Sequence, residues 1–347
     1  MSEHGKQGRP IADPNNNRFV AEGVPLHHRT EIAPRGLLTQ TSTELAAELD
    51  LRYQAALKDL TTMLGDPYFA EDGFVLYCGD CEPRLAALAE SGIRVDLTVT
   101  SPPYNIGKEY ERTQPLEDYL DWCSRWMTRV FQVTSAKGAF WLNLGYLEVP
   151  KRGLCVPIPY LLWDRSPFYL LQEVVWQYGA GVSASRRFSP RNEKWLFYVK
   201  DSTSYAFNLD AVRDPNVKYP NQKKNGKFRC NPLGKNPSDV WELPKVTTGE
   251  NRSSQERTGH PAQFPLPVIE RIVKVSSKPL DLVLDPFSGS GSTGIAASAL
   301  GRLFLGMETK VEYCEITVRR YKEFKRLRED IQRQGALFPA TEQGSIL

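Results

Sequence analysis

The sequence lacks the features that mark membrane, secreted and zinc-binding proteins. No stretch reaches the roughly 18 consecutive apolar residues that a membrane-spanning helix needs. Residues 1–18 are polar and contain no apolar segment of the kind found in secretory signal peptides. We therefore expect no membrane association and a cytoplasmic location.

Cysteine is sparse, and its spacing does not indicate a metal site. Of the six cysteines, Cys78 and Cys81 form a lone Cys-x-x-Cys. A tetrahedral zinc site needs four ligands, and neither a second cysteine pair nor a spaced histidine pair accompanies this one. We expect reduced cysteines and no bound metal.

The size and charge of the chain set only broad limits. A chain of 347 residues with 41% hydrophobic content can form one large domain with an insertion, or two domains. The formal net charge of +3 is too small to indicate a nucleic-acid partner by itself. Local clusters of charge are more informative than this total.

Apolar strands alternate with amphipathic helices along most of the chain, which predicts an α/β sheet covered on both faces. We expect strands at 74–77, 96–100, 139–142, 174–178, 195–199, 282–284 and 303–306. We expect helices from about 42 to 64 and at 85–89, 116–133, 267–275, 292–300 and 311–334. The strands at 174–178 and 195–199 are expected to form an antiparallel edge.

Residues 201–258 interrupt this alternation and read as a basic, loop-rich insert. Between 213 and 235 there are seven basic residues against one acid, Asp214. Such a cluster can neutralise DNA phosphates. The basic residues of the last helix, Arg319, Arg320, Lys322, Lys325, Arg326 and Arg328, are interspersed with acids and are expected to form a solvated face.

A strand, a glycine turn and a helix follow one another at residues 282–300. Glycines allow a sharp turn and a close approach to a ligand, and the N–H groups at a helix N-terminus attract its negative end. Glu308, 19 residues after Gly289, ends the next strand and can accept hydrogen bonds from ribose hydroxyls. Gly289-x-Gly291-x-x-Gly294 also matches the dinucleotide fingerprint, so a nicotinamide-dependent oxidoreductase stays open, as does a turn without ligand.

Ser101-Pro102-Pro103-Tyr104 directly follows an apolar strand. Two prolines make a rigid turn without N–H donors, so its carbonyls are expected to stay free as acceptors. Ser101 Oγ and the Pro102 carbonyl can accept the two N–H bonds of a base amino group, and the Tyr104 ring can stack on that base. The alternative is a structural Pro-Pro bend with a core tyrosine.

With both turns in view, the chain resembles the amino-methyltransferases of restriction–modification systems, in the β class, where the catalytic motif precedes the cofactor motif. Thr100 to Tyr104 resembles the catalytic motif in its serine form, which is typical of N4-cytosine enzymes. Adenine-N6 relatives usually carry Asp or Asn at the position of Ser101. The segment 187–194 resembles a further motif that precedes the target-recognition insert.

The resemblance implies S-adenosylmethionine as cofactor. Residues 285–293 resemble the cofactor motif, Glu308 the ribose-binding acid, residues 260–265 the segment that holds the methionine end, and Asp80 a lesser motif. The implied cofactor set is Asp80, His260, Pro261, Phe264, Asp285, Phe287, Gly289, Gly291, Thr293 and Glu308. A general-base role for His260 is not implied.

The implied fold is the Rossmann-like methyltransferase fold, a mostly parallel sheet with helices on both faces and an inserted target-recognition region. We expect an N-terminal arm and helix at 1–70, a catalytic half at 71–200, the insert at 201–258, a cofactor-binding half at 259–335 and a tail at 336–347.

The implied function is methylation of the N4 amino group of a cytosine that is flipped out of duplex DNA. The enzyme would be a monomer or homodimer in the prokaryotic cytoplasm, at the nucleoid through its binding to DNA. A cognate restriction endonuclease would be its partner. The catalytic residues would be Ser101, Pro102, Pro103 and Tyr104, and the DNA-binding residues Arg213, Lys223, Lys224, Lys227, Arg229 and Arg252. Adenine-N6 methylation, a nicotinamide-dependent oxidoreductase and a catalytically silent DNA-binding regulator are the alternatives.

Overall fold

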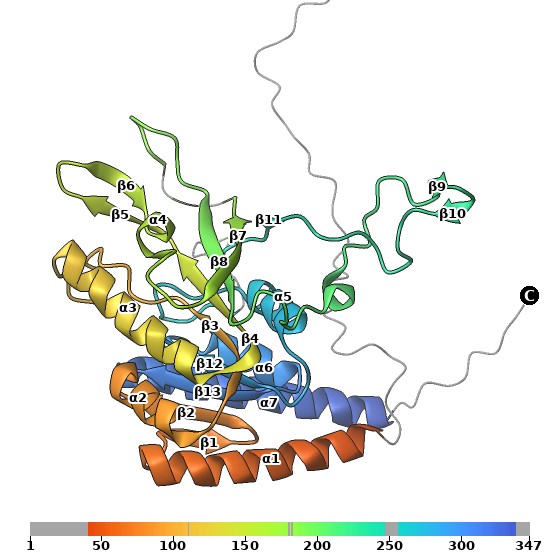
Figure 1. Ribbon diagram of the computed structural model, residues 1–347. Coiled ribbons are helices and arrows are strands. Elements are labelled where there is room, and N and C mark those ends of the chain that lie inside the picture. Colours follow the sequence, from red (N-terminus) through yellow and green to blue (C-terminus); the bar gives the residue numbers. More distant parts are fainter. Residues whose placement is uncertain (1–40, 110, 180, 182, 247–255, 338–347) are drawn as a thin grey trace, which may run out of the picture.

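The computed structural model describes residues 41–109, 111–179, 181, 183–246 and 256–337 (Figure 1). Residues 1–40 of the predicted arm and 338–347 of the predicted tail lie outside this range. Every strand and helix expected from the sequence is present. No helix in the described ranges is long and apolar enough to cross a membrane.

The helices of the chain are α1 (Thr41–Leu64), α2 (Cys81–Ser91), α3 (Leu116–Val133), α4 (Pro159–Leu162), α5 (Leu266–Ser276), α6 (Ser292–Ala299) and α7 (Val311–Leu337), with a short 3-10 helix, η1 (Leu209–Val212). The strands are β1 (Phe69–Glu71), β2 (Phe74–Cys78), β3 (Val95–Thr100), β4 (Thr134–Leu144), β5 (Tyr146–Val149), β6 (Gly153–Pro157), β7 (Tyr169–Gln177), β8 (Asn192–Val199), β9 (Lys223–Lys224), β10 (Lys227–Phe228), β11 (Val240–Glu242), β12 (Leu282–Asp285) and β13 (Leu303–Glu308).

One large sheet organises the described part of the chain, with the strand order β1-β2-β13-β12-β3-β4-β8-β7-β11. Neighbouring strands from β2 to β4 are parallel, while β8 is antiparallel to both β4 and β7. This arrangement confirms the predicted fold class and the antiparallel pairing of β7 with β8. The edge itself is β11, which pairs in parallel with β7 and comes from the segment predicted as an insert.

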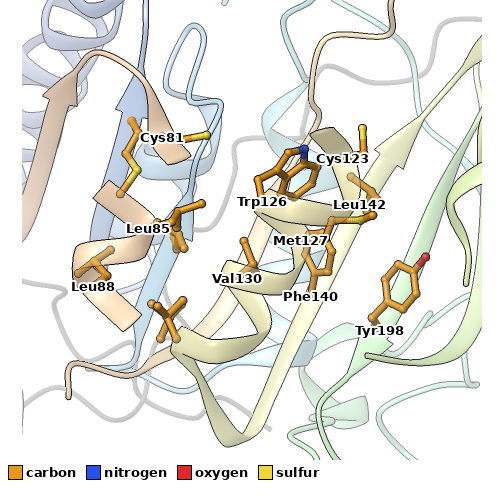
Figure 2. Packing of buried hydrophobic residues seen from close by; sticks show 14 of the residues in the cluster. Cys81, Leu85, Leu88, Cys123, Trp126, Met127, Val130, Phe140, Leu142 and Tyr198 are labelled. Carbon is orange, nitrogen blue, oxygen red and sulfur yellow. The ribbon is translucent and has the colours of Figure 1, made fainter. Parts of the chain in front are cut away.

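Both faces of the sheet are buried, because side chains alternate between them along each strand. On β2, Val75 and Tyr77 join the core beneath α2 and α3, while Phe74 and Leu76 join the core beneath α5, α6 and α7. Figure 2 shows the first core, where side chains of α2 and α3 meet those of β4 and β8. Burying each large side chain contributes about 1.5–3 kcal/mol.

Helix α3 shows why the periodic segments were predictable. Tyr119, Cys123, Trp126 and Val130 recur at intervals of three and four residues, and each is at most 1% exposed. Two acids in its first turn, Glu117 and Asp118, complement the positive end of the helix dipole. The helix therefore presents one apolar stripe to the sheet.

The prediction that the basic residues of α7 form a solvated face is wrong for Arg320. Its side chain is buried, at 9% exposed, on the face of α7 that packs against the sheet. A buried guanidinium needs hydrogen-bond partners, and Arg320 finds them in the glycine turn, as described below.

The chain runs in opposite directions from two adjacent strands, β12 and β3. After β12 it passes through α6 to β13 on one side, and after β3 it passes through α3 to β4 on the other (Figure 1). In open α/β sheets, ligands bind at such a switch point, outside the carboxyl ends of the strands. The glycine turn follows β12 and the Ser-Pro-Pro-Tyr turn follows β3, so both lie there.

Candidate functional site

A cavity of about 660 Å³ lies at this switch point. Its volume is in the range of small-molecule and cofactor sites, roughly 300–1,000 Å³. It brings together the predicted residues Asp80, Ser101, Pro102, Pro103, Tyr104, His260, Pro261, Phe264, Asp285, Phe287, Gly289, Thr293 and Glu308. Gly291, the remaining member of the predicted set, caps the N-terminus of α6 directly behind the wall.

The glycine turn has a backbone that only glycine adopts easily. Gly289 has φ 53° and Gly291 has φ 77°, both left-handed. A Cβ at Gly289 would also lie 2.9 Å from His260 Nε2. Next to it, the hydroxyl of Ser288 is buried in the cavity wall and has no hydrogen-bond partner within the described chain. The turn thus forms a concave wall that a ligand can approach closely, with Ser288 Oγ as a polar atom in that wall.

Glu308 at the end of β13 is tied to the glycine turn. One carboxylate oxygen accepts the Gly289 N–H at 2.8 Å, and the other accepts the Lys310 N–H at 2.9 Å. Burial raises the pKa of the Glu308 carboxyl above its ordinary value. Its position beside the turn fits the predicted ribose-binding acid.

Asp285 joins the two strands of the switch point. Its Oδ1 accepts a hydrogen bond from Thr100 Oγ1 at 2.6 Å and another from the Phe287 N–H at 3.1 Å. Burial raises the pKa of the Asp285 carboxyl to about 6, although these hydrogen bonds lower it. The residues that lead into the glycine turn and into the Ser-Pro-Pro-Tyr turn are therefore in direct contact.

Arg320 holds the other side of the glycine turn. Its Nη1 donates to the Ser290 carbonyl at 2.6 Å and approaches the Ser292 hydroxyl at 3.1 Å. Burial lowers the pKa of the guanidinium from its ordinary value. This contact was not predicted from the sequence, because the acids interspersed among the basic residues of α7 indicated a solvated face.

His260 lies against the glycine turn from the opposite segment. Its Nδ1 accepts the Ala262 N–H at 3.2 Å, and its ring packs edge-on against Tyr313 with centroids 4.4 Å apart. Burial, with a smaller contribution from Arg320, lowers the pKa of His260 to about 4. The imidazole is therefore neutral at pH 7 and packs on the side of the glycine turn.

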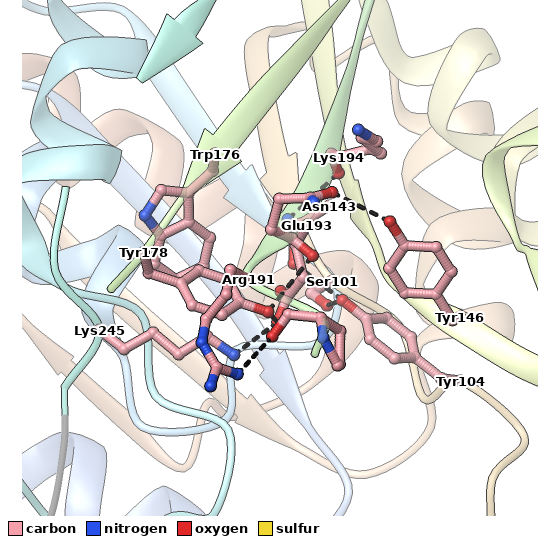
Figure 3. Close-up of polar contacts among 12 residues, drawn as sticks. Ser101, Tyr104, Asn143, Tyr146, Trp176, Tyr178, Arg191, Glu193, Lys194 and Lys245 are labelled. Atoms are coloured by element: carbon pink, nitrogen blue, oxygen red, sulfur yellow. Dashed lines mark hydrogen bonds and ion pairs between the residues drawn. The ribbon is translucent and has the colours of Figure 1, made fainter. Parts of the chain in front are cut away.

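The Ser-Pro-Pro-Tyr turn carries a directed chain of hydrogen bonds (Figure 3). Ser101 Oγ donates to the Tyr104 hydroxyl at 3.0 Å, which donates to Asn143 Oδ1 at 2.8 Å. The amide of Asn143 is oriented because its Nδ2 donates to the Lys194 carbonyl at 3.2 Å. The single Ser101 proton is thus directed at Tyr104, and the lone pairs of Ser101 Oγ remain to accept.

The expectation that the carbonyls of this turn stay free is wrong for Pro103. Its carbonyl accepts a hydrogen bond of 2.9 Å from the Tyr119 hydroxyl of α3. That bond fixes the turn to the helix beneath it. The acceptor predicted from the sequence, the carbonyl of Pro102, is a different group.

The loop that follows the turn is also held in place. The Glu111 carboxylate accepts the backbone N–H groups of Asn105, Ile106 and Lys108 at 2.8–3.1 Å. Lys310 Nζ, just beyond Glu308, donates to the Glu109 carbonyl at 2.8 Å. The loop therefore forms one rim of the cavity and is joined to the β13 side of the site.

Several cavity residues were not predicted from the sequence: Trp122, Asn143, Trp176, Glu193, Lys245 and Ser288. Glu193 lies in the segment 187–194, which resembles a family motif but had no predicted role. Trp122, Asn143 and Trp176 come from helices and strands whose local pattern indicates only burial. Ser288 lies within the predicted glycine turn and Lys245 follows β11, and no sequence signal singled out either side chain.

Four of the predicted DNA-binding residues, Lys223, Lys224, Lys227 and Arg229, lie on an extension apart from the cavity wall, at the β9–β10 hairpin (Figure 1). Lys223, Lys224 and Lys227 are exposed on the hairpin. Arg213 instead donates to Asp210 at 2.5 Å and to the Gly234 carbonyl, so its guanidinium is engaged within the chain. Arg252 lies outside the described residues.

A family model described as DNA methylase, of the N6/N4 type, matches residues 95–319. The chain belongs to the N6/N4 DNA methylase family. This confirms the predicted resemblance to the amino-methyltransferases of restriction–modification systems, with S-adenosylmethionine as methyl donor. Membership in the family favours the methyltransferase interpretation of the glycine turn over the nicotinamide-dependent oxidoreductase.

The chain is similar over most of its length to other DNA methyltransferases. The type II methyltransferase M.ScaI of Streptomyces caespitosus is 56% identical over 280 residues, covering 81% of this chain and 90% of the relative. The DNA adenine methyltransferase YhdJ of Escherichia coli K12 is 32% identical over 267 residues, covering 73% and 84%. The structure of the cytosine-N4-specific PvuII DNA methyltransferase matches with a TM-score of 0.56 at 19% identity, covering 74% of this chain and 88% of that one, and so supports the fold.

Proposed function

We propose that this DNA methylase transfers a methyl group from S-adenosylmethionine to the exocyclic N4 amino group of a cytosine flipped out of duplex DNA. The observation that carries the proposal is the direction of the hydrogen bonds from Ser101 through Tyr104 to Asn143. Because Asn143 Oδ1 can only accept, Tyr104 donates to it and accepts from Ser101. Ser101 Oγ is then an acceptor toward the cavity, as an amino group requires.

A base amino group brings two N–H donors, and the turn can supply two acceptors. Ser101 Oγ takes one and the Pro102 carbonyl takes the other. Holding both N–H bonds turns the nitrogen lone pair out of the base plane toward the methyl group. The same two oxygens stabilise the positive charge that develops on nitrogen, which is the electrostatic contribution expected of a preorganised site.

The Tyr104 ring is proposed to stack on the flipped base. A Cβ at Gly145 would lie 2.9 Å from this ring, so glycine there leaves room for it. Flipping a base out of the duplex costs a few kcal/mol. Stacking on an aromatic side chain contributes about 1–3 kcal/mol, which offsets much of that cost.

The residues around the glycine turn fit S-adenosylmethionine. We assign Glu308 to the ribose hydroxyls, and Gly289 and Ser288 to the close approach of the cofactor. His260, Pro261 and Phe264 lie on the other side of the turn, where the methionine end would be held. The bound cofactor supplies an activated methyl group, so the protein contributes positioning and electrostatics.

The choice of cytosine rests on Ser101. Adenine-N6 enzymes usually carry Asp or Asn at the corresponding position of the motif, and this chain does not. The PvuII enzyme is cytosine-N4-specific, whereas YhdJ is an adenine enzyme. Adenine-N6 methylation is therefore the alternative that an experiment must exclude.

Duplex DNA would be held by the exposed lysines of the β9–β10 hairpin, Lys223, Lys224 and Lys227, with Arg229 beside them. Their charge can replace the counterions of the phosphates. Arg213, engaged with Asp210, would support the insert rather than contact DNA. We also propose a cognate restriction endonuclease as the biological partner, supported by the similarity to the type II methyltransferase M.ScaI.

Nucleoside mass spectrometry of DNA from cells that express the protein tests the proposal. We expect N4-methylcytosine with the wild type and its absence with Tyr104→Ala. If N6-methyladenine were found instead, the target base would be adenine rather than cytosine, and the assigned site residues would stay the same. Absence of any methylated base, with S-adenosylmethionine still bound by the purified protein, would contradict the proposal and support the silent DNA-binding regulator.

A further inference from the structure

The cavity has a charged wall that the proposed chemistry has not used. Lys245 Nζ lies 2.9 Å from Glu193 Oε1 and 3.7 Å from the centre of the Tyr178 ring. Both Lys245 and Glu193 line the cavity together with Ser101 and Tyr104. In Figure 3, Glu193 lies between Lys245 on one side and the Ser101–Tyr104 turn on the other.

Sheet register explains why these groups meet. Asn143 on β4 lies opposite Trp195 on β8, and Glu193 on β8 lies opposite Trp176 on β7. Residues opposite one another share a face, and so do residues two apart on a strand. Asn143, Glu193 and Trp176 therefore project from one face at the end of three adjacent strands, next to the strand that leads into Ser101.

The backbone before Lys245 is fixed as well. The Leu243 N–H donates to the Gln177 carbonyl at 3.1 Å, and Trp176 Nε1 donates to the Leu243 carbonyl at 2.8 Å. Lys245 follows two residues later, after the β11 strand that joins the insert to the sheet. Its ammonium is thus positioned by the sheet edge, by an acid and by an aromatic face, as a preorganised donor requires.

An ammonium has three N–H donors, and Glu193 accepts one of them. Another can be donated into the cavity, so the ligand should present an acceptor there. In cytosine the amino group is followed around the ring by the N3 and O2 acceptors. In adenine the position that corresponds to O2 is a C–H group, which cannot accept a hydrogen bond.

We propose that Lys245, held by Glu193 and Tyr178, is a specificity-determining residue whose ammonium donates to the O2 carbonyl of the flipped cytosine. This inference rests on the proposed cytosine-N4 function. It assigns the choice between cytosine and adenine to a residue outside the Ser-Pro-Pro-Tyr turn. The acid Glu193 acts through Lys245 as a positioning residue.

A double-mutant cycle, with one change in the protein and one in the target base, tests this assignment. The recognition sequence is first mapped from the DNA that the wild type methylates in cells. Duplexes then carry either cytosine at the target or a 2-aminopyridine nucleoside, which keeps the amino group and the adjacent ring nitrogen but lacks O2. The proteins are the wild type, Lys245→Met and Lys245→Arg, with Lys274→Met as control, because Lys274 is also ion-paired, to Glu270, outside the cavity wall.

On cytosine, Lys245→Met should lower kcat/KM by roughly tenfold or more, the effect of removing a hydrogen bond from a charged donor. The wild type should show a similar decrease on the analogue, and Lys245→Met should hardly distinguish the two bases. Lys245→Arg should recover part of the activity, and Lys274→Met should match the wild type. Unchanged affinity for S-adenosylmethionine by calorimetry shows that the variants are folded.

If replacing cytosine by the analogue lowers kcat/KM equally for the wild type and for Lys245→Met, Lys245 does not contact O2 and the inference is overturned. The proposed methylation of cytosine would not be affected by that result. If Lys245→Met does not fold, equal wild-type rates on the two bases would overturn the inference as well. Methyl transfer by the wild type to adenine would remove the proposed function and, with it, this assignment.

Discussion

The Tyr104 hydroxyl donates a hydrogen bond of 2.8 Å to Asn143 Oδ1 while it accepts one of 3.0 Å from Ser101 Oγ. The direction follows from Asn143, whose Nδ2 is engaged by the Lys194 carbonyl. In the proposed mechanism the tyrosine therefore does more than stack on the base, because its hydroxyl also orients Ser101 Oγ as an acceptor.

Tyr104→Phe keeps the ring and removes the hydroxyl. We expect kcat to fall by up to about tenfold, the equivalent of one hydrogen bond of 0.5–1.5 kcal/mol, with unchanged S-adenosylmethionine affinity. Tyr146→Phe is the matched control, because the Tyr146 hydroxyl also donates to an asparagine, Asn192, at 2.9 Å but lies outside the cavity wall. Equal single-turnover rates for the two variants would contradict the role given to the hydroxyl.

The raised pKa of Asp285, about 6, predicts a pH dependence of cofactor binding. S-adenosylmethionine carries positive charge, so it binds better when Asp285 is ionised, and binding releases the proton of a protonated Asp285. Affinity should therefore be full above pH 7 and fall as the pH drops through about 6. His260, with its pKa near 4, stays neutral across this range.

Calorimetry between pH 5 and 8 measures this dependence. Asp285→Asn keeps an oxygen acceptor for Thr100 but cannot ionise, so its affinity should be weaker at pH 7 and nearly flat around pH 6. The same slope in wild type and variant would assign the titration to another group.

Gly289→Ala should weaken cofactor binding in addition to lowering the stability of the fold. The substitution places a methyl group 2.9 Å from His260 Nε2 at a left-handed backbone position. Gly301→Ala is the control, with φ 73° but no atom within 4 Å of the added Cβ. Both variants should be destabilised, by somewhat more than the 0.4–1 kcal/mol that glycine-to-alanine changes shift at compatible positions.

Only Gly289→Ala should also weaken S-adenosylmethionine binding, by about tenfold or more, because the added methyl group must displace His260, which lines the same cavity. Thermal unfolding and calorimetry separate the two effects. A cofactor affinity that is unchanged in Gly289→Ala would show that the turn does not approach the ligand.

The lysines of the β9–β10 hairpin should govern the salt dependence of DNA binding. Changing Lys223, Lys224 and Lys227 to Gln should reduce the magnitude of the slope of log K against log salt by about 0.9 for each phosphate that the protein no longer neutralises. A double change of the exposed α7 residues Arg319 and Arg326 to Gln is the control and should leave the slope near that of the wild type. A larger effect of the α7 change would place the DNA on the other side of the molecule.

The parts of the site that the sequence predicted are those with a local signature. Ser101 and Asp285 each follow an apolar strand and open a turn whose glycines or prolines are visible in the sequence. Their contact through Thr100 then follows from the parallel order of β3 and β12. Local pattern and tertiary structure agree at these points, and residues of both turns line the same cavity. Their roles toward cofactor and base stay predictions.

The parts that were missed depend on contacts between distant segments. Asn143 and Lys245 reach the cavity only because β4, β8, β7 and β11 lie side by side in the sheet. The three-residue strand β11 is too short to show a period in the sequence. Arg320 was a different case. Its position three residues after buried Thr317 and beside buried Tyr321 marks the inner face of α7, and the surrounding charges outweighed that signal.

In the proposed mechanism one cavity holds the methyl donor, S-adenosylmethionine, at the glycine turn and the amino group of a cytosine at the Ser-Pro-Pro-Tyr turn. The most direct measurement uses purified protein, S-adenosylmethionine with a deuterated methyl group, and duplex DNA with ¹⁵N in the cytosine amino groups. Mass spectrometry of the product nucleosides should find both labels together in N4-methylcytosine for the wild type. With Ser101→Ala the cytosine should keep its ¹⁵N label but gain little or no deuterated methyl group. Deuterated methyl on adenine, or transfer by Ser101→Ala at the wild-type rate, would contradict the account.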